Sequence, residues 1–586
     1  MTPSPTLNTR RTAGRIRNAL IVVFALSVAS TAGAQATAPR GVAEPYTPAK
    51  DARDLKSVLF NWTRNMGMLK GHDERDMVAM LEYQGKGTIQ VDGQPCTLTK
   101  FRASTNYQTF SQRIQYTCTR GNGPAYSNIE VVSGLYAWDE DTPGAEIGPT
   151  KGKVTPKAAA VQERLIRLWA SPQGAPKAAV AGTSDTFWLG ANPGTLFADG
   201  LAKVGQTSVS WESGKPVVTF PLPGVPGATA VATLDTKFMT ERVVVTQGGT
   251  TSEFAYSDYQ DWNNPLNKIE VFYAGRMVER RGGAVVRDLT TTETETGNVY
   301  VVAPVPASVR AAIKPAGQLP KGVMAKTEPP VDKSVPTPRL GAHPDLTGNW
   351  AYSDWIGNYM TGGGRRCAPT QNTDCNRQAN QTYDFELYSP SRFGNLSRPV
   401  YKPEHWDKLQ ELDMWTNKFD PVMTCQPLGV PRQGPPRRIY QSENDVTFLY
   451  FGGDAGGGYG EYRVIPTDNR QHDPQRAIEA TYMGYTVGRW EGDTLVLDSI
   501  AFVDTTWLGR GGFFHSSEMR VVERFTRQGD VLLYDVTVED PEVLVEPWVI
   551  PTRVLRRNTG PDAGLLRERG NCEVYELEDI SSQIRH

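Results

Sequence analysis

Short extended runs with a period of two, separated by turn residues, constrain this chain more than any other feature. Between about residues 216 and 302 the runs are VVTFPLP, ATAVATLD, TERVVVTQ, KIEVFYAGRMVERR and AVVRDLTTTETET. Runs of this length bounded by turn signals are typical of antiparallel strands. The chain also holds 56 Gly and 42 Pro residues, which favours a mainly β protein.

Two stretches follow a helical spacing instead. The first begins in 51–83, where apolar side chains recur every three or four positions, and the second is PKAAAVQERLIRLWASP at 156–172. We therefore expect a curved antiparallel sheet with helices packed on one face, followed by a C-terminal antiparallel β-barrel.

At 586 residues the chain is too long for one core, so several domains are expected. A Pro-, Lys- and Ala-rich stretch is interpreted as a linker between two of them. The predicted divisions are a signal peptide (1–34), a flexible leader (35–52), an α+β half-barrel domain (53–310), a linker (311–343) and a β-barrel domain (344–586).

The N-terminus has the pattern of an export signal. Four arginines precede the apolar stretch ALIVVFALSVAS at 19–30, and Ala32-Gly33-Ala34 is a cleavage motif. The apolar stretch is short for a membrane span, and no later stretch is long enough. We expect a periplasmic or secreted protein that is not integral to the membrane after cleavage. Lys plus Arg (62) balances Asp plus Glu (64), which argues against a nucleic-acid partner.

All six cysteines lie in the expected mature chain, and export favours disulfides. No C-x-x-C spacing is present, so a zinc site is not expected. The pairs that we favour are Cys96–Cys118 within a hairpin, Cys367–Cys375 across a short loop, and Cys425–Cys572 between the ends of the second domain.

Three carboxylates in 495–525 share strand faces with apolar residues. Asp498 and Asp504 alternate with apolar residues in LVLDSIAFVD, and Glu523 alternates with them in MRVVERF. A carboxylate in a dry interior must be paired, hydrogen-bonded or neutral. The acids are therefore either acid–base candidates or structural partners of arginines.

His515 lies in the glycine-rich connection GRGGFFHSS, where a histidine can move a proton near neutral pH. We take His515, Asp504 and Glu523 as catalytic candidates, with Asp504 or Glu518 orienting the ring. The alternative is a structural histidine that bonds a backbone carbonyl. Further candidates for ligand contact are Arg463, Arg489, Phe513, Phe514, Glu461, His472 and Trp507.

Other chemistries are poorly supported. The glycine-dense run FGGDAGGGYGEYR has no helix start after it, as a nucleotide-binding loop needs, and no G-x-S-x-G elbow occurs. No metal site and no cofactor are predicted. In the first domain the helix at 156–170 and its sheet offer no acid–base constellation, so that domain is interpreted as a binder or scaffold.

Two family resemblances follow from longer motifs. Residues 53–310, through AWDEDTPGA, TFPLPGVPGATAVATLD and YAGRMVERRGGAVVRDLT, resemble a module of secreted bacterial proteins that in some stands beside a metallo-β-lactamase-type domain. That resemblance implies a lipoprotein-carrier-like half-barrel. Residues 344–580, through CQPLGVPR, GRWEGDTLVLD and VEDPEVLVEPW, resemble a widespread exported bacterial family, which implies a lipocalin-like barrel.

Two functions remain open from the sequence. The first is binding of a small apolar or amphipathic ligand in the β-barrel. The second is a cofactor-independent hydrolase, lyase or isomerase that uses histidine and carboxylate chemistry in that barrel. Whether the protein is an enzyme, and its oligomeric state, are left undecided.

Overall fold

The fold is taken from a computed structural model of the chain. It describes residues 41–316, 331–561 and 563, without positions 42, 69–77, 79, 108, 149, 184–205, 263–270, 297–298, 353–398, 415, 451–460 and 510.

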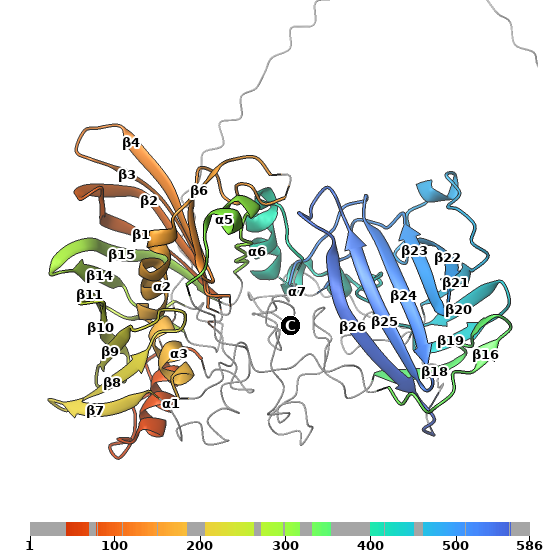
Figure 1. The fold of residues 1–586 in the computed structure, drawn as a ribbon, viewed down its shortest axis with the longest axis horizontal. Helices are drawn as coiled ribbons and strands as arrows, with labels where there is room; N and C mark the ends of the chain where they lie inside the picture. The colour runs from red at the N-terminus through yellow and green to blue at the C-terminus, as the bar shows by residue number, and fades with distance from the viewer. Residues whose placement is uncertain are drawn as a thin grey trace, which may run out of the picture. The chain divides into compact units, whose positions relative to one another are not determined.

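Thirteen strands of the described N-terminal part form one sheet in which every neighbouring pair is antiparallel (Figure 1). In spatial order the strands are β6 (Val154–Pro156), β5 (Tyr136–Glu140), β4 (Ala125–Ser133), β3 (Ser111–Thr119), β2 (Gln94–Asn106), β1 (Met80–Val91), β15 (Ala284–Thr296), β14 (Arg276–Arg281), β11 (Thr250–Ser257), β10 (Thr240–Gln247), β9 (Thr229–Leu234), β8 (Lys215–Pro221) and β7 (Ser208–Glu212). The first six strands follow one another from β1 in the middle to β6 at one edge. The later strands run from β7 at the other edge back to β15, which pairs with β1.

The central strand β1 is irregular at its glycines. Its register shifts after Gln84 against both neighbours. Gly87 has φ +142°, and a Cβ there would lie 2.0 Å from the Asp288 carbonyl oxygen, so only glycine fits. A bulge of this kind bends a strand and increases its twist, which curves the sheet at its centre.

Three helices cover one face of this sheet, here called the helix-covered face: α1 (Leu55–Asn65), α2 (Val161–Ala170) and α3 (Gly174–Ala181). Helix α1 begins after Asp54, whose side chain accepts a hydrogen bond from Ser57 N at 3.0 Å. Helix α2 begins later than its pattern predicts, because Pro156 pairs with Trp138 in the sheet. Helix α3 was not predicted. Within the expected leader, Tyr46 is hydrogen-bonded through its backbone to Asn65 of α1.

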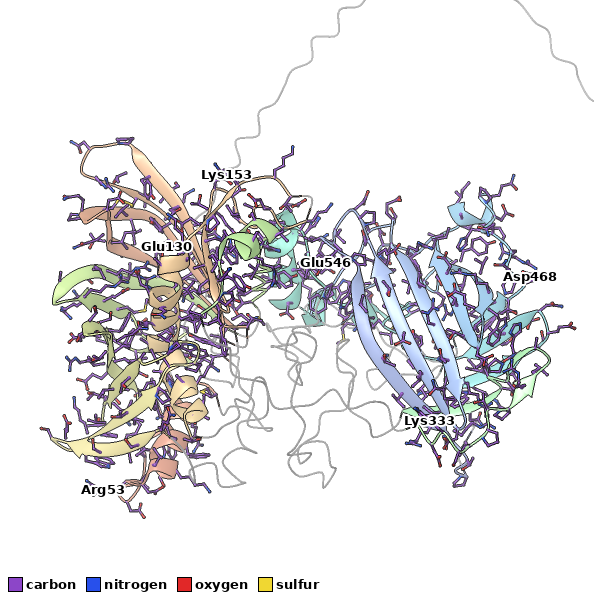
Figure 2. All side chains as sticks on the ribbon, in the orientation of Figure 1. Arg53, Glu130, Lys153, Lys333, Asp468 and Glu546 are labelled. Atoms are coloured by element: carbon purple, nitrogen blue, oxygen red, sulfur yellow. A yellow bond between two sulfur atoms is a disulfide. The ribbon has the colours of Figure 1, made fainter. Side chains whose placement is uncertain are left out.

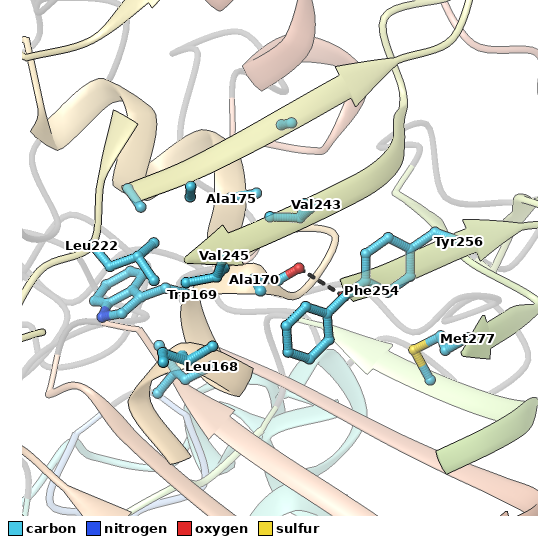
Figure 3. Close-up of a cluster of buried hydrophobic side chains, with 14 of the residues drawn as sticks. Leu168, Trp169, Ala170, Ala175, Leu222, Val243, Val245, Phe254, Tyr256 and Met277 are labelled. Carbon is cyan, nitrogen blue, oxygen red and sulfur yellow. Dashed lines mark hydrogen bonds between the residues drawn. The ribbon is translucent and has the colours of Figure 1, made fainter. Parts of the chain in front are cut away.

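The core of this part lies between the helices and the sheet. Figure 3 shows Leu168 and Trp169 of α2 facing Val245 and Phe254 of the sheet, and the Tyr256 hydroxyl donating to the Ala170 carbonyl at 2.7 Å. Leu168 and Trp169 are fully buried. Burial of such side chains stabilises the fold by roughly 1.5–3 kcal/mol each.

Nine strands of the described C-terminal part form a second antiparallel sheet. In spatial order they are β21 (Tyr462–Pro466), β20 (Asp445–Leu449), β19 (Arg438–Gln441), β18 (Gly348–Tyr352), β26 (Trp548–Arg557), β25 (Val531–Glu539), β24 (Arg520–Gln528), β23 (Thr494–Ile500) and β22 (Tyr485–Glu491).

The two edges of the second sheet come close, so the sheet is nearly closed. Asn469 N, just after β21, donates to the Gly488 carbonyl of β22 at 3.2 Å. A Cβ on Gly488 would lie 3.0 Å from the Pro466 carbonyl oxygen, so this glycine lets the two edge strands approach.

Short elements complete the described chain. They are β12 (Gln260–Asp261), β13 (Phe272–Tyr273), α5 (Ala307–Ala312), β16 (Arg339–Leu340), β17 (His343–Pro344), α6 (Trp406–Met414) and α7 (Thr416–Phe419), with 3₁₀ turns at Ala158–Ala160, Pro403–His405, Pro421–Thr424 and Arg476–Ile478.

The predicted fold class is confirmed. The chain is mainly β, with a curved N-terminal sheet that carries packed helices and a barrel-like C-terminal sheet.

Candidate functional site

The predicted acid Glu523 lies inside the C-terminal barrel and is fully buried. Its carboxylate receives two hydrogen bonds from Arg463, at 2.6 Å from Nη1 and 2.9 Å from Nη2. The Tyr534 hydroxyl donates a third at 2.9 Å. Arg463 therefore holds a protein carboxylate in the place where we expected it to hold a ligand.

The rest of the Arg463 guanidinium is also occupied. Its Nε donates to the Tyr450 hydroxyl at 2.8 Å, and Nη1 lies 3.5 Å from the Thr486 hydroxyl. Burial alone would lower the pKa of Arg463, but Glu523 outweighs burial and raises it. Phe448 and Phe525 pack beside these groups with their ring centroids 5.0 Å apart. This arrangement is an internal ion pair within a packed core.

The two aspartates are not in the interior. Asp498 points to the outer face of β23, where Arg520 binds both carboxylate oxygens at 2.8 and 2.7 Å. Burial alone would raise the pKa of Asp498, but Arg520 outweighs it and lowers it. Asp504 does not continue the face of Asp498, because β23 ends at Ile500 and Ala501 takes φ +58°. Asp504 is exposed in the following turn.

His515 is buried, with 3% of its surface exposed. Its Nδ1 lies 2.8 Å from the Ser516 carbonyl oxygen and its Nε2 2.7 Å from the Thr506 hydroxyl. Since a carbonyl only accepts, Nδ1 carries the proton and Nε2 accepts from Thr506. Burial lowers the pKa of His515, so the ring is neutral at pH 7. His515 therefore fits the alternative prediction, a structural histidine that bonds a backbone carbonyl, better than a role in proton transfer.

Sequence reasoning missed the residue that shapes the His515 loop, Asp540. Its carboxylate accepts from Ser516 N at 2.7 Å, from the Ser516 hydroxyl at 2.8 Å and from Val543 N at 3.3 Å. The signal was the Asp-Pro pair in VEDPEVLVEPW, because aspartate before a turn commonly bonds nearby backbone N–H groups. His515 and Glu523 share no hydrogen-bond partner among the described residues.

Phe513 and Phe514, which we expected to contact a ligand, both have buried side chains. Phe514 packs against Tyr401 with ring centroids 5.3 Å apart, and Lys408 Nζ lies 3.7 Å from the centre of its ring. Phe513 stacks on Tyr401 from further away. Trp507 is also buried and forms an isolated bridge with Phe514.

The remaining predicted ligand contacts are spread over the barrel. Arg489 lies on its outer face and donates to Glu491 at 2.6 Å. His472 is half-buried, with Nε2 3.1 Å from the Asp498 carbonyl oxygen. Glu461 is half-buried at the start of β21, and its backbone carbonyl accepts from Tyr450 N at 2.9 Å.

The predicted disulfide Cys96–Cys118 is confirmed and joins β2 to β3. Cys425 is also disulfide-bonded, to a partner outside the described residues. Cys367, Cys375 and Cys572 lie outside the described residues, so those two pairings stay predictions.

A group of paired charges lies instead on the helix-covered face of the N-terminal sheet, where we expected no acid–base constellation. We call it the charge network, and its members come from β4, α2, β14 and β15. They are Glu130, Glu163, Arg167, Glu279, Arg281 and Arg287.

Arg167 of α2 is the centre of the charge network. It donates to Glu279 at 3.1 Å and to Glu163, one helical turn earlier, at 3.0 Å, and it lies 3.5 Å from Glu130. Glu130 lies on β4 beside α2 (Figure 2). Arg281 of β14 joins the network through Glu163 and Glu279, at 2.7 Å each.

The carboxylates of the network are ionised at neutral pH. Burial alone would raise the pKa of Glu279, but Arg167, Arg287 and Arg281 outweigh it and lower the pKa to about 2. The pKa of Glu163 is lowered to about 2 in the same way by Arg167 and Arg281.

A small cavity of about 40 Å³ adjoins the charge network. Its wall combines apolar and aromatic side chains with charged ones. The lining residues are Leu81, Tyr83, Thr105, Tyr107, Gln112, Arg167, Ser171, Pro172, Phe254, Tyr256, Tyr273, Met277, Val278, Glu279, Arg287 and Leu289.

A signal for this site was present in the sequence. In YAGRMVERRGGAVVRDLT the period of two places Met277 and Glu279 on one strand face, and Arg287 and Leu289 on one face of the next strand. Charged residues that alternate with apolar ones on a buried face are expected to pair. The sequence did not show that Arg167 of α2 completes the group.

Comparison of the chain with protein-family models and with curated proteins finds no match. The two family resemblances therefore stay predictions. Within the described ranges, no helix has the length and hydropathy to cross a bilayer, and no group of three or more His, Cys, Asp or Glu residues is arranged to hold a metal ion.

Proposed function

We propose that this protein binds a small amphipathic molecule, and that the cavity on the helix-covered face of the N-terminal sheet is its binding site. The observation that carries the proposal is the mixed apolar and charged lining of that cavity. Phe254, Met277 and Leu289 offer an apolar surface, while Arg167, Glu279 and Arg287 carry charged groups. A mostly apolar pocket with a few convergent polar groups is the usual form of a small-molecule site.

The C-terminal barrel supports this proposal less well. In a ligand-binding barrel the interior polar groups bond to the ligand, whereas here Arg463, Glu523, Tyr450 and Tyr534 bond to one another. The expected catalytic group also provides little support, because His515 is enclosed by structural hydrogen bonds and Asp504 is exposed.

The size of the cavity implies that helix α2 moves when the ligand enters. About 40 Å³ accommodates one or two water molecules or one small polar group. A ligand with an alkyl chain needs more room along Phe254 and Tyr256, which lie beside Ala170 of α2 (Figure 3). Helix α2 is held here by its apolar core contacts and by the ion pairs of Arg167 with Glu130 and Glu279.

Export to the periplasm or the cell exterior is part of the proposal. It is supported by the N-terminal signal pattern and by the Cys96–Cys118 disulfide, since disulfides persist in oxidising compartments.

The experiment is a fluorescence titration of the full mature chain with dansyl-undecanoic acid. The test variant is Leu289→Phe, which fills the cavity from β15. The matched control is Val285→Phe on the same strand, whose side chain is exposed. We expect the cavity variant to weaken binding by on the order of tenfold or more, and the control to bind as the parent does.

A second cavity variant, Thr105→Leu, covers the case in which Leu289→Phe disturbs folding, and circular dichroism checks both. If the parent and both folded cavity variants bind the probe with equal affinity, this cavity is not the ligand-binding site. Native mass spectrometry of the protein purified from the periplasm would independently identify a bound molecule by its mass.

A further inference from the structure

We infer that the polar end of the ligand is an anion, a carboxylate or a phosphate, and that Arg287 binds it. This inference rests on the proposed function and adds the chemical class of the ligand. It comes from a buried donor on Arg287 that has no hydrogen-bond partner in the part of the chain that the structure describes.

Arg287 lies on β15, is 8% exposed and lines the cavity. Its Nη2 donates to Glu130 Oε2 at 3.1 Å, and its Nε lies 3.5 Å from Glu279 Oε2. Its Nη1 is buried and has no hydrogen-bond partner among the described residues. An unmet buried N–H on a charged group costs free energy, so a bound acceptor that reaches it gains that free energy back.

The charges around the cavity favour an anion over a cation. Each of the three network carboxylates already accepts from arginine: Glu130 from Arg287, and Glu163 and Glu279 from Arg281. An ammonium group would therefore have to displace an arginine. A carboxylate or phosphate needs no displacement, and its bond to Arg287 is a charge-assisted one.

The neighbours of Arg287 in the cavity wall can complete the site. Tyr83 and Thr105 both line the cavity and carry hydroxyl groups. Burial raises the pKa of Tyr83, so its hydroxyl stays protonated and can donate to an anion. The cavity volume of about 40 Å³ suits an anionic head group, with the apolar chain directed along Met277 and Leu289.

The test is competition against bound dansyl-undecanoic acid on the full mature chain. The competitors are dodecanoate, dodecanol and dodecylammonium, which share one alkyl chain and differ in the charge of the head group. We expect dodecanoate to bind on the order of tenfold more tightly than dodecanol, and dodecylammonium to bind most weakly. Dodecyl phosphate, run in parallel, separates a phosphate from a carboxylate preference.

Two variants give opposite expectations. Arg287→Met should bring the affinity for dodecanoate down to that for dodecanol. Glu130→Gln should strengthen dodecanoate binding and leave dodecanol unchanged, because it removes a negative charge, 3.1 Å from Arg287, that repels a bound anion. If the Arg287–Glu130 pair has a purely structural role, both variants should lose affinity for dodecanoate and for dodecanol by the same factor. A poorly folded Arg287→Met would give the same equal loss, and Glu130→Gln then decides between the two roles.

The outcomes separate the two proposals. If the probe does not bind to the protein, the proposed function fails and the inference fails with it. If dodecanol competes as well as dodecanoate, the binding site stands and the anion preference is refuted. Tightest binding of dodecylammonium would also refute it and would indicate that the carboxylates bind the ligand.

Discussion

Removing one partner of the Arg463–Glu523 pair should destabilise the C-terminal barrel far more than removing both. Glu523→Leu leaves the Arg463 guanidinium buried, 5% exposed, without its carboxylate. Breaking a buried ion pair in this way typically costs about 3–5 kcal/mol. The double variant Arg463→Met/Glu523→Leu replaces both charges with apolar side chains of similar length, and we expect it to lie within about 1–2 kcal/mol of the parent.

The coupling free energy of this double-mutant cycle is then at least about 2 kcal/mol, which is well above experimental error. The surface pair Arg520–Asp498 on the outer face of the same sheet is the matched control. Arg520 is 44% exposed at its side chain, and exposed pairs contribute about 0–1 kcal/mol, so Arg520→Met should change stability little.

The assay must isolate the C-terminal sheet, because a chain with several cores does not unfold in one two-state step. Hydrogen exchange of the β24 amides (Arg520–Gln528), followed by mass spectrometry under increasing denaturant, reports the opening of that sheet alone. The reasoning would be refuted if the double variant were destabilised by the sum of the two single variants. It would also be refuted if Glu523→Leu cost no more than Arg520→Met.

Three further predictions follow from single contacts. His515→Ala should cost roughly 2–3 kcal/mol, because it leaves the Thr506 hydroxyl and the Ser516 carbonyl unpaired in the interior; a loss below about 0.5 kcal/mol in denaturant titration would contradict the structural role. Glu279 has a pKa lowered from 4.5 to about 2, so its stabilisation is fully present above about pH 4.5 and is lost as pH falls toward 2. The difference in unfolding free energy between the parent and Glu279→Gln, roughly 3 kcal/mol at neutral pH, should therefore vanish across that window, and a constant difference would argue against the assigned ionisation. Replacing the disulfide of sequence separation 22 by Cys96→Ser/Cys118→Ser should lower the free energy of unfolding of the N-terminal sheet by about 3 kcal/mol, measured by exchange of the β2 amides, and an unchanged exchange rate would contradict this.

The local alternation of apolar and polar residues predicted most of the secondary structure, and for many side chains it predicted which residues share a strand face. The period of two placed Glu523 on the same face as Val521 and Phe525, and that face is the interior. Alternation alone did not say which face of β23 turns inward, and the structure directs Leu495 and Leu497 inward and Asp498 outward. The reading of 495–504 as one strand was wrong, since a left-handed residue at Ala501 ends the alternation before Asp504.

The sequence by itself determined the β-rich class, the helices at α1 and α2 and the glycines of the turns, because these depend on neighbours a few residues apart. It also indicated the first disulfide, because Cys96 and Cys118 lie on the two strands of one hairpin. Only the tertiary structure decided which charges meet. Arg463 and Glu523 are 60 positions apart, and Arg167 and Glu279 are 112 apart. Strand order and register bring such pairs together, and no local period encodes them. The physical reason is that a buried charge requires a partner of opposite charge. The sequence indicates that requirement, and the order and register of the strands determine which residue meets it.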